Sequence, residues 1–146
     1  VALSLGQTVP ITGAIVVSTP QDVALIDVQK AVSMFRTLNV PVLGIVENMS
    51  FYECPSCGNR DEIFGHGGAE TWAATQGMDF LGRVPIHASV AVGGDQGRPA
   101  LADDRTPEHV REALFALGAA TRGQLDKVAA LAKPEQPLIQ IEGLDG

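Results

Sequence analysis

Two apolar runs, separated by one amphipathic segment, constrain the fold of this chain most. Residues 13–18 are apolar and β-branched, and residues 40–46 are apolar at nearly every position. The segment between them carries apolar residues at the spacing of one helical face, namely Leu25, Val28, Val32 and Phe35. A strand without polar alternation is typical of a parallel sheet that helices cover on both faces. The pattern predicts a β-α-β unit and an α/β fold with a mainly parallel sheet.

Turn and capping residues predict the element boundaries. Thr19 and Pro20 indicate the start of the first helix, and Asn39 and Pro41 indicate its end. Further elements are expected as a strand at 63–64, a helix at 67–76 closed by Gly77, a strand at 80–84 ending at Pro85, and a helix capped by Thr106 and Pro107 that runs to about residue 120. The pattern weakens over residues 121–146, where we expect a helical extension and a tail, with a stray strand at 138–141 as an alternative.

Size and charge narrow the class of protein. The 146 residues are 45% hydrophobic, which is enough for a single core of ordinary size. The net charge of −7, with only three lysines, lacks the basic footprint of a protein that binds nucleic acid or anionic lipid. No segment has the length of a membrane span, and none resembles a signal peptide. We therefore expect a cytoplasmic protein, and because the chain opens with Val1 rather than Met, we expect a fragment.

Both cysteines of the chain lie in one short motif. Cys54 and Cys57 belong to the string CPSCG, in which Pro55 and Gly58 favour a tight turn whose backbone N–H groups can point at sulfur. In a reducing compartment, such a pair serves metal or redox chemistry more often than a structural disulfide. The motif predicts half of a metal site.

The cysteine pair has three interpretations, which differ in whether it binds a metal and where the other ligands come from. Zinc needs four ligands, and His66, His87 and His109 do not have the spacing of a zinc finger. If two copies of the chain meet about a two-fold axis, the four thiolates make the ligand set of a [4Fe-4S] cluster. The remaining alternatives are a zinc knuckle and an inert pair.

Other motifs give weaker indications. Asn48 follows the second strand and lies at the carboxyl edge of the sheet, where α/β proteins bind ligands, but a turn cap explains it equally well. The glycine-rich residues 65–68 precede a helix and fit either anion contact or a simple turn. The chain contains no GxxxxGK[ST] phosphate loop and no spacing that indicates a Ser-His-acid site.

Five ordered segments resemble one known family. They are residues 18–27 (STPQDVALID), residues 42–50 (VLGIVENMS) followed by CPSCG, residues 63–68 (IFGHGG), residues 80–85 (FLGRVP) and residues 94–99 (GDQGRP). Together they resemble the Mrp/ApbC family of iron-sulfur cluster carrier ATPases, up to about residue 120. The family is a MinD-like, deviant-Walker branch of the P-loop NTPases.

The resemblance implies a function and a set of site residues. It implies a homodimer that binds ATP and Mg²⁺, carries a labile [4Fe-4S] cluster and delivers it to apo iron-sulfur proteins. Cys54 and Cys57 would bind the cluster between two subunits, Asn48 would contact the adenine, and Pro85 and Ile86 would form the other wall of the base pocket.

The resemblance also implies a division of the chain. Because the family's phosphate loop is missing, residues 1–120 would be the C-terminal portion of the ATPase domain, and the chain alone should not hydrolyse ATP. Residues 121–146 would form an extension. The alternative is a zinc-binding or interaction module without ATPase activity. A MinD-type positioning ATPase is disfavoured by the acidic charge and by the cysteine pair.

Overall fold

A computed structural model describes residues 9–131 of the chain. Within these residues the centre is a four-stranded sheet of β1 (Ala14–Ser18), β2 (Val42–Glu53), β3 (Arg60–Asp61) and β4 (Phe80–Ile86). β2 pairs in parallel with β1 and with β4, and antiparallel with β3. The predicted α/β fold with a mainly parallel sheet is confirmed.

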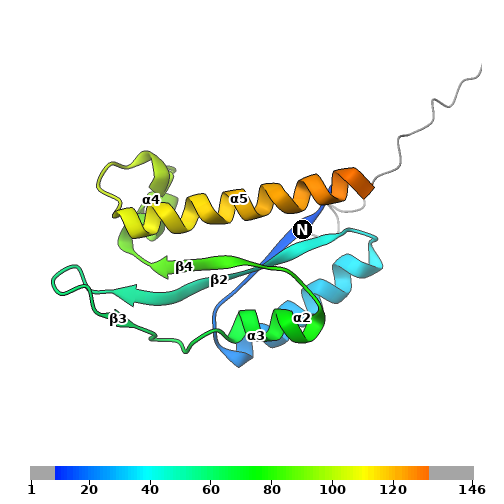
Figure 1. The fold of residues 1–146 in the computed structure, drawn as a ribbon, viewed down its shortest axis with the longest axis horizontal. Helices are drawn as coiled ribbons and strands as arrows, with labels where there is room; N and C mark the ends of the chain where they lie inside the picture. The colour runs from blue at the N-terminus through cyan, green and yellow to red at the C-terminus, as the bar shows by residue number, and fades with distance from the viewer. Residues whose placement is uncertain (1–8, 132–146) are drawn as a thin grey trace, which may run out of the picture.

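Helices cover both faces of the sheet (Figure 1). α2 (Asp22–Thr37) and α3 (Gly68–Gln76) lie on one face, and the long α5 (Glu108–Leu131) crosses the other. α4 (Ala88–Asp95) follows β4 at the carboxyl end of the strands, and a 3-10 helix, η1 (Ala100–Ala102), leads on toward α5. No helix in residues 9–131 is long and apolar enough to cross a membrane.

The core lies on both sides of β2. Neighbouring residues of this strand face opposite ways, so Ile45 packs with α2 and α3 whereas Val46 packs under α5. Residues 43–46 are all buried, which explains why this stretch is apolar without alternation.

β2 continues to Glu53, well beyond the predicted end at residue 46. The sequence pattern stops at Glu47 because a charged residue is unusual in a core strand. In the structure Glu47 is completely buried and accepts hydrogen bonds from the Ala69 backbone N–H (2.9 Å) and the Ser50 hydroxyl (2.6 Å). Arg83 lies 3.4 Å from the same carboxylate. These partners compensate for the burial of its charge.

The first helix begins slightly later than predicted. Its N-cap is Gln21 rather than Thr19, whose hydroxyl instead hydrogen-bonds to the Gln21 side chain. The carbonyl of Pro20 packs against Gly68, where a Cβ atom would lie 2.0 Å from the Pro20 oxygen. The Pro20 backbone therefore forms part of the contact between the starts of α2 and α3. The helix ends as predicted, before Asn39, whose φ is +56°.

Two predicted strand positions were wrong. Residues 63–64 lie in a turn, and the short strand is Arg60–Asp61 because Arg60 is the antiparallel partner of Glu53. β4 does not end at Pro85 but includes it and runs to Ile86. The ladder between β2 and β4 is irregular there, so that proline, which has no N–H, is tolerated.

The remaining helices match in part. α3 lies between the predicted caps Gly67 and Gly77, both left-handed, with φ of +63° and +62°. α5 begins just after Pro107 but continues past residue 120 to Leu131. α4 and η1 are absent from the sequence prediction. The predicted tail strand at 138–141 lies outside the described residues.

Candidate functional site

The cysteines lie at the tip of a hairpin that extends β2. This cysteine hairpin (residues 52–61) consists of the end of β2, the loop 54–59 and β3, and it projects at the carboxyl end of the sheet (Figure 1). The Cys54 N–H donates to the Asn59 carbonyl (2.9 Å), and the Gly58 N–H donates to the Cys54 carbonyl (2.8 Å). Gly58 has a φ of +68°, which closes the turn without strain. Cys57 is exposed and Cys54 is half-buried.

The loop favours the thiolate form of Cys54. Its pKa lies below the ordinary value for a thiol, first because the Ser56 backbone N–H donates to its sulfur and second because the Cys57 N–H does so. The predicted turn with N–H groups directed at sulfur is therefore present. Since the thiolate is the form that binds metal, the loop prepares Cys54 as a ligand.

Each histidine considered as a further ligand has a partner in the structure. His66 lies 2.5 Å from Glu62, and His109 lies 3.3 Å from Glu53. The Nδ1 atom of His87 accepts a hydrogen bond from the Ser89 backbone N–H (3.1 Å). In the part of the chain that the structure describes, no three His, Cys, Asp or Glu side chains are grouped to hold a metal ion. Within residues 9–131, Cys54 and Cys57 thus have no third side chain of these types grouped with them.

A cavity of about 180 Å³ lies between the middle of β2, the end of β4 and the start of α4. It brings together the three residues proposed as a base pocket, and its lining is Asn48, Met49, Pro85, Ile86, His87, Val90 and Ala91. The Oδ1 atom of Asn48 accepts a hydrogen bond from the Met49 N–H (3.0 Å), which orients the side-chain amide. The apolar walls with one amide suit a planar ring that carries polar edges. We call this cavity the base pocket.

Sequence reasoning missed the α4 side of the base pocket. α4 contains Gly93 and Gly94, which weaken a helical pattern, so the helix that carries Val90 was not predicted and His87 was considered only as a zinc ligand. One signal was available, because His87 is the N-cap of α4 and Ser89 follows two residues later.

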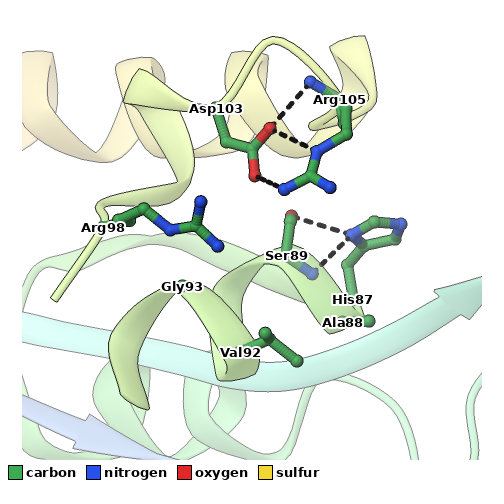
Figure 2. Close-up of a pocket in the computed structure, with 8 residues that line it drawn as sticks. All are labelled: His87, Ala88, Ser89, Val92, Gly93, Arg98, Asp103 and Arg105. Carbon is green, nitrogen blue, oxygen red and sulfur yellow. Dashed lines mark hydrogen bonds and ion pairs between the residues drawn. The ribbon is translucent and has the colours of Figure 1, made fainter. Parts of the chain in front are cut away.

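A second cavity, of about 240 Å³, is also lined by His87, and Figure 2 draws the residues around it. Its polar lining includes Ser89, Arg98, Asp103 and Arg105; of these, the sequence analysis named only the segment that contains Arg98, and gave it no role. Asp103 binds the Arg105 guanidinium through both oxygens, at 2.9 and 2.8 Å. Hydrogen bonds from the Arg105 side chain, and then from its backbone N–H, hold the pKa of Asp103 well below its usual range.

The glycine-rich residues 65–68 are occupied by structural contacts. Gly68 packs against the Pro20 carbonyl, and the Ala69 N–H at the start of α3 already donates to Glu47. The turn interpretation of this segment therefore accounts for its glycines better than anion binding does.

The sequence of this chain is similar to those of known proteins. A family model described as ParA, NUBPL iron-transfer P-loop NTPase, matches residues 1–119. The iron-sulfur cluster transfer protein NUBPL of Mus musculus is 52% identical over 99 residues, covering 68% of this chain and 31% of that protein. The iron-sulfur cluster carrier protein of Escherichia coli K12 is 45% identical over 130 residues, covering 89% of this chain and 33% of that protein. The chain thus spans about a third of the length of these relatives.

Solved structures are also similar to this chain. A nucleotide-binding protein of Archaeoglobus fulgidus in complex with ADP superposes with a TM-score of 0.55 at 37% identity, over 66% of this chain and 41% of that chain. The cell division ATPase MinD of Pyrococcus furiosus gives 0.54 at 20% identity, over 83% and 44%, which shows a shared fold. The chain belongs to the ParA-like, NUBPL iron-transfer family of P-loop NTPases.

Proposed function

We propose that this chain is the cluster- and base-binding part of an iron-sulfur cluster carrier. Its cargo is a [4Fe-4S] cluster held between two copies by Cys54 and Cys57 of each. The single observation that carries this proposal is the cysteine hairpin, which presents two cysteines and a turn suited to thiolate at a projecting tip. The names of the relatives, which are cluster transfer and cluster carrier proteins, support it.

The ligand count supports a homodimer. A [4Fe-4S] cluster takes four cysteine thiolates, and each chain has two cysteines. The hairpin projects from the sheet, so a two-fold axis at its tip would place the hairpins of two copies side by side.

Delivery is a ligand exchange. Each iron–sulfur bond to a carrier cysteine breaks as one forms to a cysteine of the apo iron-sulfur protein. The cluster moves with its oxidation state unchanged, and four carrier thiolates remain to take up protons. The exchange begins when a recipient thiolate reaches an iron of the cluster.

ATP and Mg²⁺ complete the proposal for the longer protein. Asn48 would donate from its amide nitrogen to the adenine, since its oxygen is engaged by Met49, and Pro85 and Ile86 would pack against the ring. These 146 residues include no GxxxxGK[ST] motif, so the proposed ATP hydrolysis requires phosphate-binding residues from outside them. The Archaeoglobus protein, which is similar to this chain and was solved in complex with ADP, supports the nucleotide.

The proposal also assigns place and extent. We assign the carrier to the cytoplasm, where a CxxC pair stays reduced. Residues 1–120 are assigned to the ATPase domain and residues 121–146 to an extension, a division supported by the family match, which ends at residue 119.

Anaerobic reconstitution tests the proposal. Iron and sulfide should give a brown dimer on size-exclusion chromatography, with about two irons per chain. Cys54→Ser should lose the dimer and its visible absorbance together, whereas His66→Ala, which alters an exposed loop histidine, should keep both. Iron retained in full by a monomer, or a colourless protein that holds zinc, would refute the carrier proposal.

A further inference from the structure

The base of the cysteine hairpin is fastened by one carboxylate. Glu53, the last residue of β2, precedes Cys54, and its side chain is 23% exposed. One oxygen accepts a hydrogen bond from Arg60 Nε across the hairpin (2.9 Å), and Arg60 also lies over the Phe51 ring, 4.5 Å from its centroid. The other oxygen lies 3.3 Å from Nδ1 of His109. Glu53 therefore joins the hairpin both to itself and to α5.

His109 connects the contacts of Glu53 to the base pocket. It is in the first turn of α5, is 22% exposed, and makes an edge-to-face contact with the His87 ring, with 6.3 Å between centroids. His87 lines the base pocket, and its ring is oriented by the Ser89 N–H and hydroxyl, both at Nδ1 (Figure 2). A path of direct side-chain contacts thus runs from the base pocket through His87 and His109 to the residue before Cys54.

The backbone between the two places is irregular. The register between β2 and β4 shifts between Asn48 and Tyr52, and Met49, a non-glycine residue, has a φ of +56° in this interval. A bulge bends its strand and interrupts the ladder, so the direction of the strand beyond it depends on other contacts. Glu53 and His109 supply such a contact immediately beyond the bulge.

We propose that Glu53 and His109 are positioning residues that fix the direction of the cysteine hairpin, and that His87 makes this direction respond to a ligand in the base pocket. The inference rests on the proposed function, because it couples the two sites that the function assigns. A base against Pro85 and Ile86 lies beside His87, so it restricts the His87 ring. The His109 ring, held edge-on to it, transmits the restriction to Glu53.

Hydrogen–deuterium exchange on the full, cluster-free chain tests the proposal, with adenosine as the probe, because it carries the base without the phosphates. His109→Ala should speed exchange of the hairpin amides, residues 52–61, by about fivefold, the size expected for the loss of one polar side-chain contact. His109→Gln, whose amide can still donate to Glu53, should restore slow exchange. Arg122→Ala is the matched control, since it removes an exposed ion pair with Asp126 on the same helix.

Adenosine separates positioning from general structure. It should slow hairpin exchange in the wild type but not in His109→Ala, although both bind adenosine equally and unfold at the same urea concentration. Unchanged hairpin exchange in His109→Ala, or an equal response to adenosine in both proteins, overturns the proposal. Absence of adenosine binding refutes the base pocket and the coupling with it. None of these readouts needs a cluster, so a failed reconstitution counts against the carrier function alone.

Discussion

The buried carboxylate of Glu47 allows a stability prediction from the structure. Glu47→Ala leaves the Ala69 N–H without its acceptor, and a hydrogen bond to a charged group contributes about 1.5–3 kcal/mol. The buried Ser50 hydroxyl also loses its partner, at about 1 kcal/mol. Arg83 is 31% exposed and still has Glu70, so its loss adds little. We expect a total loss of about 2.5–4 kcal/mol, which overlaps the range of about 3–5 kcal/mol for removing one partner of a buried pair.

Urea denaturation measures this loss. The single tryptophan, Trp72, lies on α3, whose first turn Glu47 holds, and it packs against the core, so its fluorescence reports the relevant region. With an m-value of about 1.5–2 kcal/mol/M, the midpoint should fall by about 2 M. Glu70→Ala is the matched control, because this exposed partner of Arg83 should cost less than about 1 kcal/mol. A Glu47→Ala protein within about 1 kcal/mol of the wild type would show that the hydrogen bonds to Glu47 are not what stabilises the start of α3.

Three further predictions concern stability. Gly68→Ala should lower the free energy of unfolding by about 2–3 kcal/mol, because the new Cβ would lie 2.0 Å from the Pro20 oxygen; an unchanged thermal midpoint contradicts this contact. Gly118→Ala, in open space on α5, should raise that free energy by about 0.5–1 kcal/mol, and a lower midpoint in circular dichroism contradicts the helical assignment there. Asp103, whose pKa is lowered chiefly by Arg105, stabilises the fold fully above its unfolded-state pKa, about 4, and loses this contribution as the pH falls below it. Asp103→Asn should therefore reduce the fall in stability between pH 5 and pH 2 in urea titrations, roughly the window set by that linkage, and an identical acid profile would contradict the role of the pair.

The sequence predicted the sheet because its signals were local. The uninterrupted apolar run before Glu47 reflects burial on both faces of β2, and the glycines at 67 and 77 reflect left-handed caps. What it missed depends on contacts between distant residues. Glu47 ended the predicted strand because its partners Ala69 and Arg83 lie far along the chain.

In the candidate site, too, the local features were predicted and the contacts between distant residues were missed. The cysteine pair and its turn were recognised from five consecutive residues, since the chemistry is encoded in their spacing. The grouping of Asn48 with Pro85 and Ile86 was inferred from family resemblance, and the structure places all three in one cavity. His87 and His109 could not be identified, because their importance lies in a contact between the end of β4 and the start of α5, which are far apart in the sequence and share no motif.

The cysteine hairpin is the continuation of β2, the strand that crosses the core. The effect of an insertion in this strand therefore depends on whether it adds an odd or an even number of residues. Side chains alternate along β2, and one extra residue beyond the bulge would turn Glu53 to the opposite side of the ladder, away from His109. Two extra residues would restore the side but move the tip outward by about 6–7 Å. We therefore expect the cysteine hairpin to tolerate, at most, insertions of an even number of residues. Natural length variation should accumulate instead in the turn that carries residues 62–66.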